Sequence, residues 1–231
     1  MAGSLSHGWR EELSVTLSPS AARAFILANT TVMRPPHVPE IVLHLATEAH
    51  DLWLRTEEEL EAIGLPPPFW AFAWAGGQGL GRFVLDHPEL VRGKSVLDFA
   101  SGSGLVGITA AKAGAAWVDA ADIDPFCAQA MSLNAEANKV QLASRTQDLI
   151  GVDEGWQVVL AGDVFYDRNF AEQLLPWFQN LAMRGATVLV GDPGRSYLPR
   201  QHLVEQAVYE VAVTRALEDA EVKRTTVWSL G

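Results

Sequence analysis

Short apolar runs alternate with amphipathic stretches along the chain from residue 94 onward. The apolar runs predict strands, and the stretches between most of them have the spacing of apolar residues that is typical of helices. The predicted strands cover residues 95–99, 117–122, 142–147, 157–162 and 186–191, and the predicted helices cover about 105–113, 125–138 and 168–182. Strands that alternate with helices indicate parallel βαβ units, so we expect a doubly wound α/β sheet.

The end of the chain does not follow this alternation. Residues 199–209 have a helical pattern, whereas 210–217 and 222–230 are both β-prone, with Asp219 and Ala220 between them. This arrangement predicts a C-terminal antiparallel hairpin. Together with the five parallel strands, the hairpin makes a seven-strand sheet.

The segment before residue 76 has a mixed character. Prolines interrupt the first 40 residues, residues 41–47 alternate as a short strand would, and Glu57–Ile63 looks helical until three prolines end the pattern. An aromatic, glycine-rich stretch then passes into a helix near Gln78. We expect a partly helical and partly irregular N-terminal lead-in.

Length and composition favour one domain. With 231 residues, 48% of them hydrophobic, the chain can bury a single full core. We therefore expect residues 1–231 to form one domain, with 1–75 as the lead-in and 76–231 as the ligand-binding core. No stretch is both long and apolar enough to cross a bilayer.

Charge and cysteine content limit the partners and the compartment. A formal net charge of −11 disfavours nucleic acid, because phosphate binding needs clustered Lys and Arg. The single cysteine, Cys127, fits a reducing compartment. None of the six scattered histidines pairs with it at a metal-ligand spacing, so we expect no structural metal. The first residues lack an apolar segment and contain glutamates, so we expect neither a secretory signal nor a transit peptide.

The most specific chemistry lies in VLDFASGSG, residues 96–104. An apolar strand reaches Asp98, and a turn through Gly102 and Gly104 leads into a helix. Such a turn lets the backbone approach a ligand closely and points free N–H groups at it. The acidic side chain suits a ligand with an amino group better than one with phosphates. We therefore expect S-adenosylmethionine rather than a nucleotide.

Aspartates end the predicted parallel strands. Ligands in open α/β sheets bind at the carboxyl ends of the strands. One aspartate there is often only the N-cap of the next helix, but five in succession indicate a binding site. These residues are Asp98, Asp122, Asp148, Asp163 and Asp192.

A dinucleotide-binding enzyme is the alternative that the glycines leave open. Gly102, Gly104 and Gly107 satisfy G-x-G-x-x-G, and Asp122 follows as a possible ribose acceptor. Three features count against it. Asp98 would repel a pyrophosphate, the motif lies far from the N-terminus, and a hairpin closes the sheet where a dehydrogenase usually continues into a second domain.

Three segments resemble the successive motifs of class I, seven-strand S-adenosylmethionine methyltransferases, which have a Rossmann-like sheet. They are VLDFASGSG, AADIDP (120–125) and DVFYD (163–167). The D-x-x-Y that begins at Asp163 is similar to the signature of the family 16 lysine methyltransferases, which act on proteins. One departure is Ala100, where the family usually has glycine; we expect a negative φ there, which alanine tolerates.

Further segments resemble the lysine methyltransferases that modify the β subunit of electron transfer flavoprotein. They are FWAFAWAGGQ (69–78), GDPGR (191–195) and TTVW (225–228). The resemblance implies S-adenosylmethionine as cofactor, S-adenosylhomocysteine as product, and that β subunit as the protein substrate.

The resemblance also implies cofactor-binding roles. Gly102 and Gly104 would lie beneath the methionine part of the cofactor, with Asp98 accepting from its ammonium directly or through water. Asp122 would accept from both ribose hydroxyls, because a carboxylate takes two parallel hydrogen bonds.

Three residues would complete the cofactor site. Gln147 and Asp148 would lie near the adenine edge. Trp74 resembles the aromatic residue that covers the cofactor in the family, and an ordinary core position is an equal alternative for it. Asp124, just before a proline, is expected to be a helix N-cap.

Asp163 and Tyr166 are the expected catalytic residues. Methyl transfer to lysine is an in-line displacement that mainly needs positioning. The amine must be neutral, and a nearby carboxylate raises its pKa, so Asp163 is read as an anchor rather than a strong base. Tyr166 would steer the amine with its hydroxyl and ring face. Arg195 is read either as a contact to an acidic part of the substrate or as a surface arginine.

The sequence therefore predicts a cytoplasmic, bacterial-type protein-lysine N-methyltransferase. Three alternatives remain open: a methyltransferase of a ribosomal protein, one of a small-molecule amine, and a catalytically silent module that only binds the cofactor.

Overall fold

The computed structural model describes residues 18–46, 67–213 and 221–230. The helix expected at Glu57–Ile63 and the link between the hairpin strands, with Asp219 and Ala220, lie outside this part of the chain.

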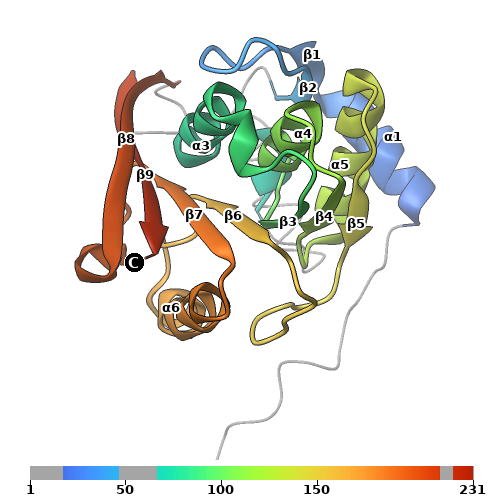
Figure 1. Ribbon diagram of the computed structural model, residues 1–231. Coiled ribbons are helices and arrows are strands. Elements are labelled where there is room, and N and C mark those ends of the chain that lie inside the picture. The colour runs from blue at the N-terminus through green and yellow to red at the C-terminus, as the bar shows by residue number, and fades with distance from the viewer. Residues whose placement is uncertain (1–17, 47–66, 214–220, 231) are drawn as a thin grey trace, which may run out of the picture.

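A seven-stranded sheet with the order β5-β4-β3-β6-β7-β9-β8 forms the centre of the molecule (Figure 1). The first five of these strands are parallel, and β9 and β8 are antiparallel additions at one edge. This confirms the predicted doubly wound sheet with a C-terminal hairpin. The strands are β3 (Ser95–Phe99), β4 (Trp117–Ala121), β5 (Ala143–Arg145), β6 (Val158–Gly162), β7 (Thr187–Asp192), β8 (Leu203–Ala212) and β9 (Val222–Leu230).

The hairpin begins earlier than the sequence predicted. Residues 199–209 do not form an α-helix: a short 3₁₀ turn, η3 (Arg200–His202), leads directly into β8. Along β8, Ala207, Tyr209 and Val211 face the core, which is the period of two that a strand requires. Pairing with β9 from Leu203 to Ala212 supplies the backbone hydrogen bonds that outweigh the helical propensity of this segment.

Helices cover both faces of the sheet (Figure 1). The helices α3, α4 and α5 lie on one face, and α6 lies on the other. The helix α1 packs against α5. The helices are α1 (Pro19–Asn29), α3 (Ala75–Asp86), α4 (Leu105–Lys112), α5 (Pro125–Asn138) and α6 (Arg168–Met183), with short 3₁₀ turns η1 (Phe69–Ala71) and η2 (Pro88–Leu90).

The lead-in contributes a small element of its own. The strand expected at 41–47 is β2 (Leu43–Leu45), which pairs antiparallel with β1 (Thr31–Met33) in a separate two-stranded sheet. Leu43 and Leu45 are buried in a cluster that also contains Leu105 and Ile108 of α4. The lead-in therefore packs against the core.

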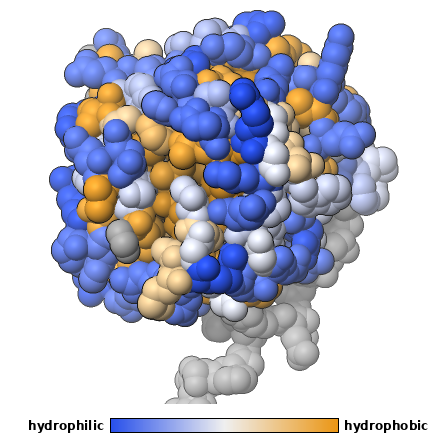
Figure 2. Space-filling model, viewed as in Figure 1, coloured by the Kyte–Doolittle hydropathy of each residue, from blue (hydrophilic) through white to orange (hydrophobic). Residues whose placement is uncertain are grey.

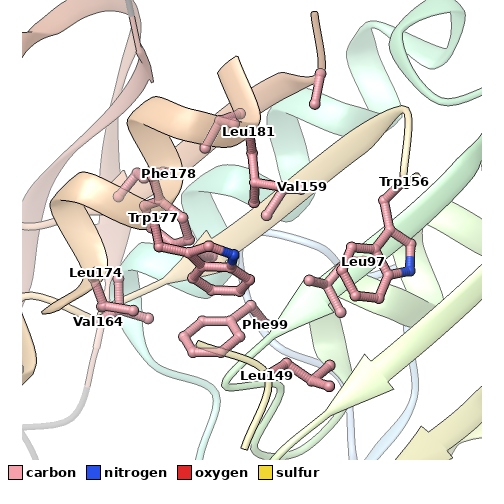
Figure 3. Close-up of a cluster of buried hydrophobic side chains, with 14 of the residues drawn as sticks. Leu97, Phe99, Leu149, Trp156, Val159, Val164, Leu174, Trp177, Phe178 and Leu181 are labelled. Carbon is pink, nitrogen blue, oxygen red and sulfur yellow. The ribbon is translucent and has the colours of Figure 1, made fainter. Parts of the chain in front are cut away.

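Alternate residues of the strands face opposite sides of the sheet and belong to two different hydrophobic layers. Leu97, Phe99 and Val159 face α6, where Trp177 and Phe178 fill the space between helix and sheet (Figure 3). The rings of Phe99 and Trp177 meet edge-on, with centroids 4.9 Å apart. The neighbouring positions along β3 and β6 face α3 and α4 on the other side; they include Val96, Val158 and Leu160.

One face of the molecule combines hydrophilic and apolar areas (Figure 2). Seen from the side of Figure 1, polar residues surround an apolar area near the middle of this face (Figure 2). Among the residues that the structure describes, no helix is long and apolar enough to cross a membrane.

Glycines allow α3 to lie directly on the ends of β6 and β7. A Cβ at Gly76 would lie 2.3 Å from the Gly191 carbonyl oxygen, and one at Gly162 would lie 2.9 Å from the Gly77 backbone. Only residues without a side chain permit this approach. The contact brings the N-terminus of α3 to the carboxyl ends of β6 and β7.

We expect Gly76→Ala to lower the free energy of unfolding by about 1–3 kcal/mol, because the new methyl group has no space between helix and sheet. Gly77→Ala is the matched control on the same helix, since its Cβ would lie 3.8 Å from the nearest atoms. That change should be neutral or stabilising by up to ~1 kcal/mol. Urea unfolding of both variants measures the difference between their free energies of unfolding. Equal values would show that α3 does not pack closely against β6 and β7 at Gly76.

Candidate active site

A cavity of about 1020 Å³ opens at the carboxyl ends of the parallel strands. It lies beside β3, where the sheet order reverses direction, as expected for ligand sites in such sheets. Eight of the nine predicted site residues line it: Trp74, Asp98, Gly102, Asp122, Gln147, Asp148, Asp163 and Tyr166.

The ninth residue, Gly104, lies behind the cavity wall as the N-cap of α4. It has a φ of 82°, and a Cβ there would lie 3.2 Å from the Met131 side chain. Its role is therefore to let the turn close against α5. Asp192, the fifth strand-end aspartate, caps a turn and is absent from the cavity lining.

The turn after β3 is more constrained than the sequence suggested. Ala100 has a φ of 53°, so the expectation of a negative φ was wrong. A left-handed conformation costs a non-glycine residue about 1–2 kcal/mol. Neighbouring contacts fix this turn: the Ser101 N–H donates to the Ala121 carbonyl oxygen at 3.0 Å, and the Gly102 N–H donates to Asp122.

Protein carboxylates occupy N–H groups of this turn that were expected to face a ligand. The Gly102 N–H donates to Asp122 Oδ2 at 2.9 Å, and the Gly107 N–H donates to Asp98 Oδ2 at 2.8 Å. A pyrophosphate needs such donors and would meet two carboxylates instead. The donor set thus disfavours a dinucleotide and fits a ligand that brings its own positive charge and hydroxyl groups.

Asp98 is almost fully buried, with 1% of its surface exposed. Burial raises the pKa of its carboxyl to about 7, although hydrogen bonds from the Ser101 hydroxyl and the Gly107 N–H lower it, and the Asp122 charge raises it further. A cationic group nearby would favour the ionised form. Asp98 is therefore suited to an ammonium partner.

Asp122 organises the start of the next helix as well as the turn. Its Oδ1 accepts from the Asp124 N–H at 3.0 Å, while Oδ2 holds Gly102. Asp124 in turn accepts from the Phe126 N–H at 2.8 Å, with Pro125 at the first helical position. The predicted N-cap role of Asp124 is confirmed.

Gln147 and Asp148 form the cavity edge beyond β5. Both are exposed. Gln147 accepts from Arg145 Nε at 3.2 Å, and Asp148 accepts from the Ile150 N–H at 3.0 Å. These bonds orient the two side chains at the rim, and their contact with adenine stays a prediction.

Trp74 combines both of its expected positions. Its indole N–H donates to the Phe69 carbonyl oxygen at 3.1 Å, and its ring packs against Phe72 in a hydrophobic cluster. The same ring lines the cavity and lies 5.6 Å from the Arg195 guanidinium. Trp74 is a partly buried wall of the site.

Asp163 follows β6 with a φ of 59° and lies buried against α3. Its Oδ2 accepts from the Gly77 N–H at 3.0 Å. Since Trp74, the N-cap of α3, makes no side-chain capping bond, Asp163 supplies the cap from another part of the chain. A carboxylate also interacts favourably with the positive end of a helix dipole.

Arg195 is the residue whose place the sequence analysis missed. Its Nη2 and Nε lie 2.7 and 3.2 Å from Asp163 Oδ1. Arg195 therefore binds a carboxylate of its own chain, which neither of the two expected roles, a surface arginine or a contact to the substrate, included. Gly162, the last residue of β6, pairs with Gly191, the next-to-last residue of β7, which places Asp163 beside the GDPGR turn.

Tyr166 lies at the mouth of the cavity. Its side chain is 54% exposed, and its ring is 5.9 Å from that of Phe69 and 6.0 Å from that of Phe170. Partial burial, together with the charges of Asp122 and Asp167, raises the pKa of its phenol. Tyr166 therefore stays protonated at neutral pH and can donate or accept a hydrogen bond.

No cluster of His, Cys, Asp and Glu with the makings of a metal site occurs among the described residues. The titratable groups that line the cavity are carboxylates, the Cys127 thiol, a phenol and a guanidinium. Seven strands in this order, a glycine-rich turn with an acidic strand end, and a second acidic residue after the neighbouring strand define the class: this is a methyltransferase fold.

Solved structures agree on the fold. The Trm5b structure from Pyrococcus abyssi superposes with a TM-score of 0.54 at 14% identity, covering 87% of this chain and 56% of that one. Magnesium protoporphyrin IX methyltransferase from Synechocystis PCC 6803, solved with bound SAM, gives 0.50 at 15% identity, covering 67% and 78%. In sequence, the ribosomal protein L11 methyltransferase (PrmA) family matches residues 83–163.

Curated relatives are more specific. The electron transfer flavoprotein beta subunit lysine methyltransferase of Xenopus laevis is 40% identical over 219 residues, covering 92% of this chain and 88% of the relative. The protein of that name from Homo sapiens is 35% identical over 221 residues, covering 89% and 80%. The chain belongs to the family of electron transfer flavoprotein beta subunit lysine methyltransferases.

Proposed function

We propose that this protein transfers methyl groups from S-adenosylmethionine to lysine side chains of the electron transfer flavoprotein β subunit. The observation that carries the proposal is the position of Asp163 and Tyr166. Both line the same cavity as the acidic turn after β3, and Tyr166 lies at the exposed mouth. The names of the family's curated members support the substrate.

The residues around the turn fit the proposed cofactor. Asp98 would face its ammonium group, Asp122 its ribose hydroxyls, and Gln147 with Asp148 its adenine. Gly102 would give the backbone the close approach, and Trp74, which lines the same cavity, would cover the cofactor. When bound, S-adenosylmethionine supplies an electrophilic methyl group on a sulfonium.

The acceptor side of the cavity would position the lysine. Asp163 would accept a hydrogen bond from the amine and orient it, and Tyr166 would hold the amine by its hydroxyl and ring face. The lysine nitrogen then forms its bond to carbon as the sulfur–carbon bond breaks, and the displaced proton leaves to water. These residues contribute mainly alignment, which is what an in-line displacement requires.

A ribosomal-protein methyltransferase is the second candidate, favoured by the match to the ribosomal protein L11 methyltransferase family. That match covers residues 83–163 and therefore ends before Tyr166 and the GDPGR turn. It covers the cofactor half of the site and says little about the acceptor. The exposed mouth at Tyr166 favours a protein side chain over a small amine that needs an enclosed pocket.

The remaining expectations complete the proposal. The chain would act as one domain, with residues 1–75 as the lead-in and 76–231 as the cofactor-binding core, and without nucleic acid. We propose a cytoplasmic location, supported by the single buried, free Cys127.

Incubation with methyl-labelled S-adenosylmethionine and recombinant electron transfer flavoprotein tests the function. We expect label on β-subunit lysines, located by mass spectrometry. If only a ribosomal protein were labelled, in an extract that lacks endogenous methyltransferase, the proposed methyl transfer would be supported and the proposed substrate would be wrong. Binding of S-adenosylhomocysteine with no transfer to any protein would indicate a silent binding module.

A further inference from the structure

A cation of the protein itself already lies beside the carboxylate that would anchor the lysine. Arg195 contacts Asp163 Oδ1 through two nitrogens, and the side chains of the pair are 21% and 10% exposed. The opposite oxygen, Oδ2, binds the Gly77 N–H. Asp163 is therefore held from two sides, by α3 and by the turn after β7.

The turn after β7 is built to present this arginine. Asp192 Oδ1 accepts from the N–H groups of Gly194 at 2.6 Å and Arg195 at 2.7 Å, which closes the turn. The guanidinium then lies 5.6 Å from the Trp74 ring, within the range of a cation–π contact. Backbone and side chain of Arg195 are thus both fixed toward the cavity.

Charge compensation has a direct consequence for the proposed reaction. A carboxylate alone would stabilise the protonated, unreactive form of a lysine that docks beside it. Paired with a guanidinium, the carboxylate has little net charge to offer an ammonium. It still has lone pairs for one hydrogen bond from a neutral amine.

We propose that Arg195 is a positioning residue, which fixes the Asp163 carboxylate and compensates its charge so that the substrate lysine docks as a neutral amine. This inference rests on the proposed lysine methylation. In this role, the GDPGR turn acts on the acceptor side of the site through Asp163, and it does not need to contact the substrate itself.

The charged groups around Asp163 set the sign of the effect. The pKa of Asp163 is raised to about 6 when all influences act together. Burial and the Asp192 charge raise it, whereas Arg195 and the Gly77 N–H lower it. Without the guanidinium, the pKa of Asp163 rises further, and the ionised carboxylate holds an ammonium more strongly. Both changes move the acidic limb of the activity profile to higher pH.

Arg195→Gln tests the proposal, because it removes the charge and keeps a hydrogen-bond donor. We expect the acidic limb of kcat against pH, which reports groups in the enzyme–substrate complex, to move up by about one unit or more, with about a tenfold loss of kcat on that limb. Arg195→Lys restores the charge without the planar fork, so it should return the limb toward the wild-type position. Arg200→Gln, the same change on the same loop, is the control and should leave the limb in place.

Two further measurements separate the possible failures. A ¹³C NMR titration of the Asp163 carboxyl requires no substrate; its pKa should be higher in Arg195→Gln than in the wild type, and an unchanged value would overturn the inference. In an active enzyme, a lower rate with an unshifted pH profile would also overturn it, leaving Arg195 a structural role. Wild-type protein that transfers no methyl group, but shows the NMR shift, would contradict the proposed function and retain the charge compensation.

Discussion

Asp163→Ala is expected to lower methyl transfer by about 100-fold or more, while binding of S-adenosylhomocysteine changes by less than about threefold. The carboxylate lines the cavity and is held between the Gly77 N–H and Arg195, and we propose that it contacts the substrate lysine and not the cofactor. Transfer of labelled methyl groups and calorimetric binding measure the two effects separately. Full activity in this variant would show that the chemistry has been placed at the wrong residue.

The same change removes the cap of α3, so stability needs its own control. Loss of an N-cap costs about 1 kcal/mol, and removal of the Asp163 carboxylate from its ion pair with Arg195 adds to this cost, so urea unfolding of the variant must accompany the activity measurement. Asp163→Asn keeps the shape and an oxygen for the Gly77 N–H, and should be closer to wild type in stability while remaining impaired in transfer. If activity followed stability across the two variants, Asp163 would be only a cap.

Asp122→Ala should weaken cofactor binding by about 100-fold or more, since each hydrogen bond to a charged group contributes about 1.5–3 kcal/mol. Two bonds to ribose hydroxyls are expected to be lost, together with the support that Asp122 gives to Gly102 and Asp124. Calorimetry with S-adenosylhomocysteine measures the affinity. Near-normal binding would remove Asp122 from the cofactor site.

A matched aspartate controls for the loss of local structure. Asp153 accepts from the Gly155 N–H two residues on, much as Asp122 does from Asp124, and it is absent from the cavity lining. Asp153→Ala should leave cofactor affinity unchanged, which would tie the effect at Asp122 to the ribose contact.

The parallel core of the fold was readable in the sequence because its signals are local and repeated. Buried strands such as 95–99 are short apolar runs, and β3, β4 and β6 are each followed by an α-helix. Residues 203–209 of β8 were misread as helical because valine and alanine among polar residues fit a helix as well as a strand. Pairing with β9, a contact between distant residues, decides between them.

In the candidate site too, local sequence signals predicted some residues, whereas contacts between distant residues were missed. Strand ends identified Asp98, Asp122 and Asp163 as cavity residues, because the rule depends only on strand direction. The Arg195–Asp163 pair was not predicted, since it joins two loops 32 residues apart. The positive φ of Ala100 was also missed, because tertiary hydrogen bonds hold a conformation that alanine alone disfavours.

The glycine-rich start of α3 also limits how this enzyme can be engineered for heat resistance. Exchanging helical glycines for alanine is a common route to a more stable protein, and α3 has four of them in 12 residues. At Gly76 and Gly79 a methyl group would come within 2.3 and 2.6 Å of neighbouring atoms, and at Gly81 within 3.3 Å. Only Gly77 has ordinary room, so most of that thermostability must be sought on other helices.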